Sequence, residues 1–120
     1  MDNFIIRTIR PEDNKTLASI IRNTLTEFGA NRPGTVYYDE TTDHLYELFQ
    51  KERCIYYVAE IKGVIAGGSG IFPSAGLPAQ TCELVKMYLI PSARGMGLGK
   101  LLIEQCLEFA KTNGYRQVYL

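Results

Sequence analysis

The stretch Arg94-Gly95-Met96-Gly97-Leu98-Gly99-Lys100 decides the fold of this chain, because it joins a predicted strand to a predicted helix. The strand occupies residues 82–90, which are rich in apolar and aromatic side chains, and Pro91 ends it. Apolar side chains then recur at helical spacing up to about residue 113. We therefore expect a strand, a tight glycine-rich turn and a long amphipathic helix within residues 83–114.

The turn has the features of an anion-binding site. The first N–H groups of a helix have no partner within the helix, and the helix dipole adds positive charge at that end. Glycine residues let an anion approach the backbone closely, and Arg94 and Lys100 add full positive charges. A diphosphate fits these features. A glycine-rich turn without a ligand is the alternative, which the cost of about 1 kcal/mol for glycine inside a helix disfavours.

Two known glycine-rich motifs fail at identifiable positions of this turn. A P-loop requires glycine where this chain has Arg94, and serine or threonine where it has Leu101. The dinucleotide-binding pattern G-x-G-x-x-G requires its third glycine one residue after Gly99. Neither motif therefore explains the turn.

A third pattern fits at every specified position. Arg94-x-x-Gly97-x-Gly99 resembles the acetyl-CoA turn of the GNAT N-acetyltransferases, written Arg/Gln-x-x-Gly-x-Gly/Ala. The preceding Leu84-x-x-Met87-Tyr88-Leu89-x-Pro91, the following amphipathic helix and the opening Ile9-Arg10-Pro11-Glu12-Asp13 also resemble that family. The resemblance implies one domain over residues 1–120 with an α/β (α+β) fold, in which helices flank a mixed, mostly antiparallel sheet.

The other elements are predicted from local patterns. Three further strands before the turn are expected at residues 4–9, 55–61 and 64–72, the last two joined by a hairpin, and a last strand begins at residue 117. Helices are expected from Pro11 to about residue 28 and around residues 45–49. The glycines at positions 67, 68 and 70 indicate close approach by another group, either a packed helix or the acceptor, and we favour the helix.

GNAT domains continue beyond the strand that begins at residue 117. The resemblance therefore implies that the usual last helix and two strands are lacking, which leaves a sheet edge open. A shortened gene product, a chain shortened in preparation, and a partner chain that completes the sheet all remain open. The last alternative includes a homodimer formed by exchange.

The resemblance implies transfer of an acetyl group from acetyl-CoA to a primary amine of a small molecule or peptide, without a metal. Backbone N–H groups beside the pantetheine arm would stabilise the developing oxyanion. The coenzyme-binding residues implied are Met87, Tyr88, Leu89, Arg94, Gly95, Met96, Gly97, Leu98, Gly99 and Lys100.

Glu83 aligns with a glutamate that serves as general base in many GNAT enzymes. Strict alternation places Glu83, Val85, Met87 and Leu89 on one face of the strand, unless a bulge intervenes. An ion pair of Glu83 with Lys86 or Arg32 is the alternative. The family's general acid lies in the lacking part, and Tyr119 is poorly placed to replace it.

The acceptor side is less defined by the sequence. The resemblance implies that Phe28, Tyr37 and Tyr38 shape the acceptor pocket, and packing of the tyrosines onto the core is an equal alternative. The chain could instead bind coenzyme A with little turnover, or serve as an interaction module that a partner chain completes.

The composition of the chain limits the partners and the cellular location that can be expected. Thirteen basic and 13 acidic residues balance, which argues against a nucleic-acid or acidic-membrane partner. No apolar run is long enough to span a bilayer, and the N-terminus lacks the pattern of a signal peptide. The three cysteines have no metal-ligand spacing and are expected to be reduced, which indicates a cytoplasmic protein.

Overall fold

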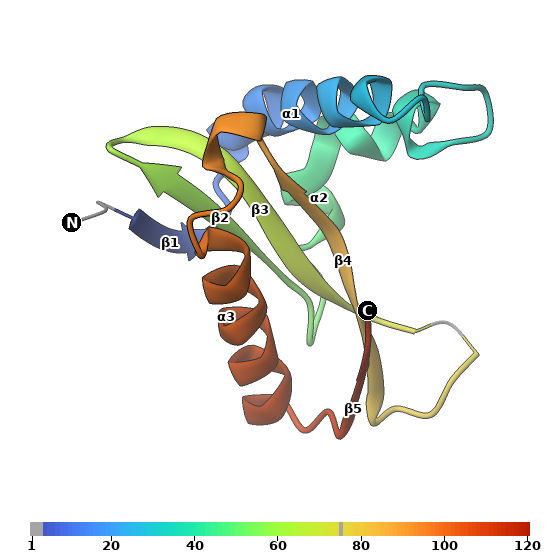
Figure 1. Cartoon of the computed structure of the whole chain (residues 1–120). Helices are drawn as coiled ribbons and strands as arrows, with labels where there is room; N and C mark the ends of the chain where they lie inside the picture. Colours follow the sequence, from blue (N-terminus) through green and yellow to red (C-terminus); the bar gives the residue numbers. More distant parts are fainter. Residues whose placement is uncertain (1–3, 75) are drawn as a thin grey trace.

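The computed structural model describes residues 4–74 and 76–120, and it contains a five-stranded sheet with the order β1-β2-β3-β4-β5 (Figure 1). Neighbouring strands from β1 to β4 are antiparallel, and β5 is parallel to β4. The mixed, mostly antiparallel sheet expected from the sequence is therefore confirmed. The strands are β1 (Phe4–Thr8), β2 (Ile55–Ile61), β3 (Val64–Pro73), β4 (Thr81–Leu89) and β5 (Gln117–Tyr119).

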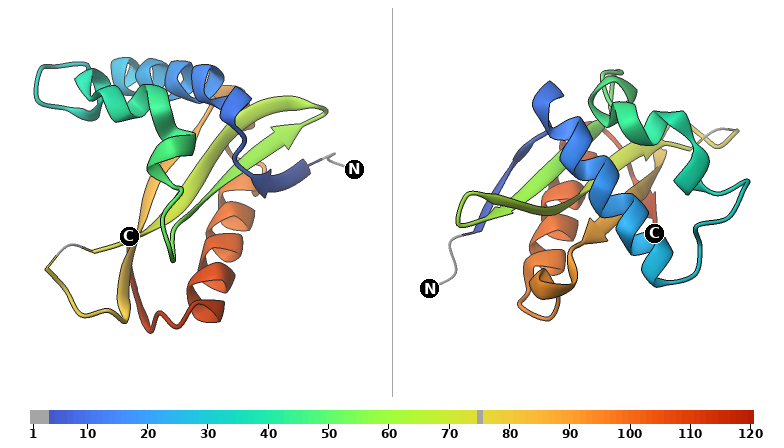
Figure 2. Two further views of the ribbon diagram at one scale, coloured as in Figure 1. Left: turned by 180° about the vertical axis from the view of Figure 1, so that it is seen from behind. Right: turned by 90° about the horizontal axis from the view of Figure 1, so that it is seen from above.

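Helices cover both faces of the sheet. Figures 1 and 2 show α1 and α2 on one face and α3 on the other. The α-helices are α1 (Asn14–Glu27), α2 (Leu45–Leu48) and α3 (Leu98–Thr112). The short 3-10 helices are η1 (Pro11–Asp13), η2 (Val36–Tyr38), η3 (Glu40–His44) and η4 (Pro91–Ala93).

Helical spacing of the apolar residues explains how α1 and α3 pack. The buried residues of α3 recur every four positions, so they form one stripe against the sheet. The buried residues of α1 likewise share one face. The stripe of α3 is Leu98, Leu102, Cys106 and Ala110, and the face of α1 is Leu17, Ala18, Ile20 and Ile21.

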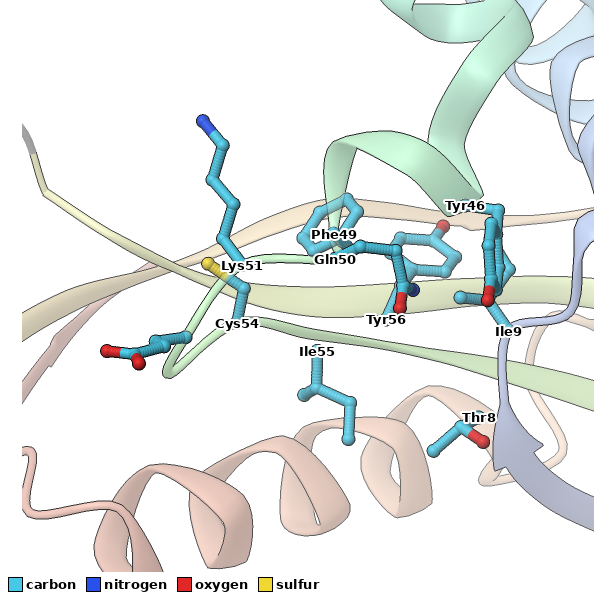
Figure 3. Close-up of a pocket in the computed structure, with 10 residues that line it drawn as sticks. Thr8, Ile9, Tyr46, Phe49, Gln50, Lys51, Cys54, Ile55 and Tyr56 are labelled. Carbon is cyan, nitrogen blue, oxygen red and sulfur yellow. The ribbon is translucent and has the colours of Figure 1, made fainter.

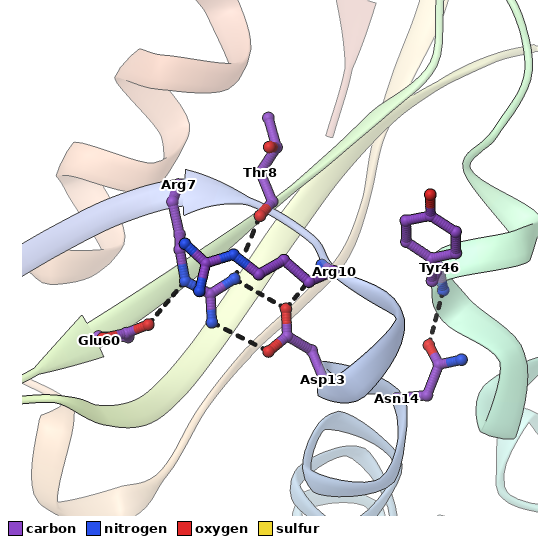
Figure 4. Close-up of polar contacts among 7 residues, drawn as sticks. All are labelled: Arg7, Thr8, Arg10, Asp13, Asn14, Tyr46 and Glu60. Atoms are coloured by element: carbon purple, nitrogen blue, oxygen red, sulfur yellow. Dashed lines mark hydrogen bonds and ion pairs between the residues drawn. The ribbon is translucent and has the colours of Figure 1, made fainter.

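An ion cluster fixes the start of α1 to the edge of the sheet (Figure 4). Arg7 of β1 donates two hydrogen bonds to the buried carboxylate of Asp13, at 2.8 and 2.9 Å, and a third to Glu60 of β2. The side chain of Asn14 accepts a hydrogen bond from the backbone N–H of Tyr46, which ties α1 to α2.

A bulge at Lys86 interrupts the regular alternation of β4. Gly68 of β3 faces Tyr88 and Gly70 faces Val85, so β4 contains one residue more than β3 over this segment. Lys86 has a φ of 52°, in the left-handed region.

The bulge changes which side chains of β4 share a face. Val85 and Tyr88 pack in the cluster beneath α1 and α2, whereas Leu89 packs in the cluster beneath α3. The side chain of Met87 likewise approaches Gly99 of α3. The bulge is the exception that was allowed for the shared face of Glu83, Val85, Met87 and Leu89, and it separates Val85 from Met87 and Leu89.

The glycines of β3 make room for neighbouring strands. A Cβ atom on Gly67 would overlap the carbonyl oxygen of Tyr88, and one on Gly68 would lie 2.5 Å from the ring of Tyr56. One on Gly70 would lie 2.7 Å from the carbonyl oxygen of Ile55. At Gly67 and Gly68 the nearest atoms belong to β4 and β2, so the expected helix packing is absent there. At Gly70 the ring of Phe49, at the C-terminal end of α2, would lie 2.8 Å from the added Cβ atom.

Candidate active site

The glycine-rich turn connects η4 to α3 as expected. Gly95 and Gly97 have φ values of 79° and 85°, a conformation that favours glycine, and Gly97 immediately precedes α3. The N–H groups of the first turn of α3 have no partners within the helix. The side chains of Met96 and Lys100 are exposed beside this turn. The turn therefore offers both unpaired backbone donors and a positive charge.

Arg94 braces the turn against the two neighbouring elements. Its guanidinium donates hydrogen bonds of 2.9 and 3.2 Å to the carbonyl oxygen of Leu89, and 2.8 and 3.0 Å bonds to the carboxylate of Glu27. It also lies 5.5 Å from the centre of the Phe28 ring. The hydrogen bond from Arg94 lowers the pKa of Glu27. Glu27 thus compensates part of the positive charge that the sequence places at this turn.

A hollow of about 380 Å³ lies between the C-terminal end of α1 and the end of β4. Three of the residues expected to contact the coenzyme arm line this hollow, together with Arg94 and Phe28. The lining residues are Thr24, Phe28, Met87, Tyr88, Leu89 and Arg94. Phe28, expected in the acceptor pocket, therefore lines the same hollow as residues expected to bind the coenzyme.

The edge of β4 next to this hollow is open. Strand β5 pairs with β4 only at Thr81, Cys82 and Glu83. From Leu84 to Leu89, β4 has no strand partner on that edge among the described residues. Backbone groups on an unpaired edge are free to bond another molecule.

A second pocket of about 520 Å³ is also lined by Tyr88. It lies among η2, η3, the end of α2, β3 and β4. Tyr88 lines both this pocket and the hollow, so the two spaces meet at this residue. The residues that line the pocket are Val36, Asp39, Thr41, Leu48, Phe49, Phe72, Glu83, Val85, Lys86 and Tyr88.

Glu83 is exposed at this pocket. Within residues 4–74 and 76–120 it forms no ion pair, so the expected alternative of pairing with Lys86 or Arg32 is absent there. Tyr37 and Tyr38 do not line the pocket. Arg22 instead donates a hydrogen bond to the backbone carbonyl of Tyr37, and the Tyr37 and Tyr38 rings lie 5.0 Å apart.

Two charged pocket residues were not identified as site residues from the sequence. Lys86 is half-buried, and burial lowers its pKa although Asp39 opposes this effect. Asp39 accepts hydrogen bonds from the backbone N–H and the hydroxyl of Thr41, which lower its pKa. Lys86 is a polar residue between the apolar Val85 and Met87, and this position was the only sign of its role in the sequence. Regular alternation, however, would place Lys86 on the face opposite Val85.

A further pocket of about 560 Å³ lies beside the start of β2 (Figure 3). Lys51 and Cys54 lie toward one end, and Tyr46 and Ile9 toward the other. Burial raises the pKa of the Cys54 thiol, which disfavours the reactive thiolate. None of the site residues predicted from the sequence lines this pocket.

The described residues contain no group of three or more His, Cys, Asp or Glu side chains placed to hold a metal ion. The same residues contain no helix that is long and apolar enough to cross a membrane.

The family comparison agrees with the geometry. The model of the Acetyltransferase (GNAT) family matches residues 18–120. The chain belongs to the GNAT family of acetyltransferases. The uncharacterized N-acetyltransferase YjgM of Escherichia coli K12 is 35% identical over 117 residues, which are 97% of this chain and 70% of that protein.

Solved structures share the GNAT fold. An acetyltransferase of Clostridium acetobutylicum with acetyl-CoA superimposes with a TM-score of 0.74 at 20% identity, covering 96% of this chain and 78% of that one. The aminoglycoside N-acetyltransferase AAC(6')-Iy in complex with CoA gives a TM-score of 0.73 at 19% identity, and the match covers 99% of this chain and 76% of that one. At these identities the likeness concerns the fold.

Proposed function

We propose that this GNAT chain transfers the acetyl group of acetyl-CoA to a primary amine. The observation that carries the proposal is the meeting of two spaces at Tyr88, beside the open edge of β4 and next to the glycine-rich turn. The hollow on one side would receive the coenzyme arm, and the pocket on the other would receive the amine. Solved relatives that contain acetyl-CoA or CoA support this assignment.

The residues of the turn would hold the diphosphate of the coenzyme. The unpaired N–H groups at the start of α3 and the exposed Lys100 supply donors and charge, and Gly95, Gly97 and Gly99 keep the approach open. Arg94 would act mainly as a brace that orients the turn, because its guanidinium contacts Leu89 and Glu27. The coenzyme supplies the activated thioester when bound.

Glu83 would accept the proton of the incoming amine. Its carboxylate is exposed at the pocket and unpaired among the described residues, so it is free to meet a protonated amine. Unpaired N–H groups of β4 would donate hydrogen bonds to the thioester oxygen as it gains charge, which typically contributes about 10²–10³ in rate per donor. We place this reaction in the cytoplasm, which the three free cysteines support.

Calorimetric titration with acetyl-CoA tests the coenzyme site. We expect the wild type to bind and Gly97→Trp to lose binding, because the new side chain adopts the left-handed conformation poorly and covers the donors of α3. Gly34→Trp is the matched control, since Gly34 has a similar φ of 86° in an exposed loop. Equal binding by wild type and Gly97→Trp would contradict the proposed site.

Release of free thiol in the presence of amines tests the chemistry. We expect Glu83→Gln to lower kcat/KM by about 10²–10⁴-fold, the usual contribution of a general base. Glu12→Gln, at an exposed carboxylate on η1, is the control. Binding of acetyl-CoA without thiol release for any amine would indicate a coenzyme-binding domain instead of an enzyme.

A further inference from the structure

The bulge of β4 brings Lys86 into the second pocket. In a regular strand, consecutive side chains point to opposite faces. Here Val85 and Lys86 both line the pocket, because Lys86 adopts a φ of 52°. The hydroxyl of Tyr56, a fully buried residue, donates a 2.7 Å hydrogen bond to the carbonyl oxygen of Lys86 and holds the bulge in place. The backbone that directs the Lys86 side chain into the pocket is thus held by the fold.

The Lys86 ammonium lacks an ionic partner of its own. No carboxylate within the described residues lies within 4.0 Å of it, and the same residues offer its Nζ atom no hydrogen-bond acceptor. The charge of Asp39 raises the pKa of Lys86 against the effect of burial, but the Asp39 carboxylate is bonded to Thr41. A half-buried cation without a partner is unfavourable, and an anionic group of a ligand would compensate it.

The same pocket contains a free charge of opposite sign. Glu83 lies three positions before Lys86 on β4, and it too is unpaired among the described residues. Apolar side chains form most of the remaining wall. These are Val36, Leu48, Phe49, Phe72, Val85 and Tyr88. The wall thus presents the unpaired carboxylate of Glu83, the carboxylate of Asp39 that is bonded to Thr41, the ammonium of Lys86 and an apolar surface.

We propose that the acceptor is an amine that also carries a carboxylate, namely an amino acid with an apolar side chain. Its ammonium would face Glu83, its carboxylate would bind Lys86, and its apolar side chain would lie against Phe49 and Phe72. This inference rests on the proposed acetyl transfer. The N-terminus of a peptide lacks the adjacent carboxylate, so it would leave Lys86 unpaired.

Matched acceptors and a matched lysine control test this inference. Phenylalanine, phenylalaninamide and 2-phenylethylamine share an aromatic body and an amine, and only phenylalanine carries the carboxylate. We expect wild type to have the highest kcat/KM for phenylalanine. We expect Lys86→Met to lower the ratio of kcat/KM for phenylalanine to that for 2-phenylethylamine by about tenfold or more, as for loss of a charged hydrogen bond.

Two further variants separate charge from structure. Lys86→Arg retains the positive charge and should restore most of the ratio. Lys62→Met is the control, because Lys62 has a φ of 51° in an exposed turn and lies outside the pocket. An unchanged ratio in Lys86→Met, or a wild-type preference for 2-phenylethylamine or phenylalaninamide, would overturn the inference while leaving acetyl transfer intact.

If no acetyl transfer is detected, binding measurements still test whether the pocket recognises the carboxylate of an amino acid. Calorimetric titration of the acetyl-CoA-saturated and free protein with phenylalanine and 2-phenylethylamine reports the affinity without turnover. Tighter binding of phenylalanine that Lys86→Met removes would support carboxylate recognition even if the proposed enzyme activity is wrong. Equal or undetectable binding of both compounds by wild type and variant would overturn it.

Discussion

The hydroxyl of Tyr56 on β2 donates a 2.7 Å hydrogen bond to the main-chain carbonyl of Lys86 on β4, across the intervening strand β3. Gly68 and Gly70 of β3 permit this contact, since a Cβ atom on either would lie within 3 Å of the Tyr56 ring. The bulge that brings Lys86 into the second pocket therefore depends on a residue two strands away.

Removing this hydroxyl should loosen the bulge. We expect Tyr56→Phe to lower the free energy of unfolding by about 1–3 kcal/mol, because a buried carbonyl loses its donor. Denaturant unfolding measures the change. Tyr46→Phe is the control, since the Tyr46 hydroxyl has no hydrogen bond within the described residues. Equal stability of Tyr56→Phe and Tyr46→Phe would show that the bulge is held by other contacts.

Adding a methyl group at Gly68 should displace the Tyr56 ring. The new Cβ atom would lie 2.5 Å from both the ring and the backbone carbonyl of Tyr57, so backbone must move. We expect Gly68→Ala to destabilise the fold by about 2 kcal/mol or more, within the range of overpacked cores. Gly34→Ala should cost about 1 kcal/mol, because its Cβ meets no atom within 4 Å and only the φ of 86° is unfavourable. The difference between the two unfolding midpoints is the measurement, and a reversed order would refute this account of Gly68.

Local sequence patterns were sufficient to predict most of the fold. The apolar periodicity of residues 98–112 predicted α3, and the closely spaced glycines at positions 95, 97 and 99 predicted the turn before it. Lys62-Gly63 predicted the hairpin between β2 and β3. These features depend on neighbouring residues, so they can be read without a structure. The family resemblance then supplied the mixed, mostly antiparallel character of the sheet and its flanking helices.

The arrangement of the candidate site could not be predicted in the same way. One extra residue in β4 determines the face of the sheet on which the Lys86 side chain lies. The resulting bulge is held by a hydrogen bond from Tyr56, which is 30 positions away in the sequence. Likewise, the partner of Arg94 is Glu27, 67 positions away at the end of α1. Contacts between distant residues of this kind leave no local pattern. The coenzyme and base roles predicted for the turn and for Glu83 remain predictions.

Releasing Arg94 from Glu27 should strengthen the attraction of the turn for anions. Glu27→Gln removes a negative charge beside the turn while keeping the size of the side chain. We expect about two- to threefold tighter binding of acetyl-CoA at low salt, and no difference at high salt, where exposed charges are screened. Calorimetric titration at two salt concentrations measures this effect. Glu108→Gln, on an exposed position of α3, is the control. Weaker binding by Glu27→Gln would mean that Glu27 acts through orienting Arg94.

The Asp13 carboxylate should make stability depend on pH. Its burial raises the pKa, but hydrogen bonds from Arg7 and from the backbone N–H of Arg10 outweigh this effect and lower the pKa below its usual value. Because the folded-state pKa is below that of the unfolded chain, the contribution is complete above the unfolded-state value near 3.9 and is lost as the pH falls through the folded-state value. Stability should therefore decrease on acidification.

A substitution at Asp13 tests this pH dependence. At neutral pH we expect Asp13→Asn to lower the free energy of unfolding by about 3 kcal/mol, since it breaks a buried ion pair. Asp43→Asn, which breaks the exposed pair with Arg22, should cost about 1 kcal/mol or less. Unfolding midpoints at pH 7 and at pH 3 should differ less in Asp13→Asn than in wild type, because the variant has no carboxylate to protonate at that position. A variant as acid-sensitive as wild type would assign the loss of stability to other carboxylates, such as Glu60, the second partner of Arg7.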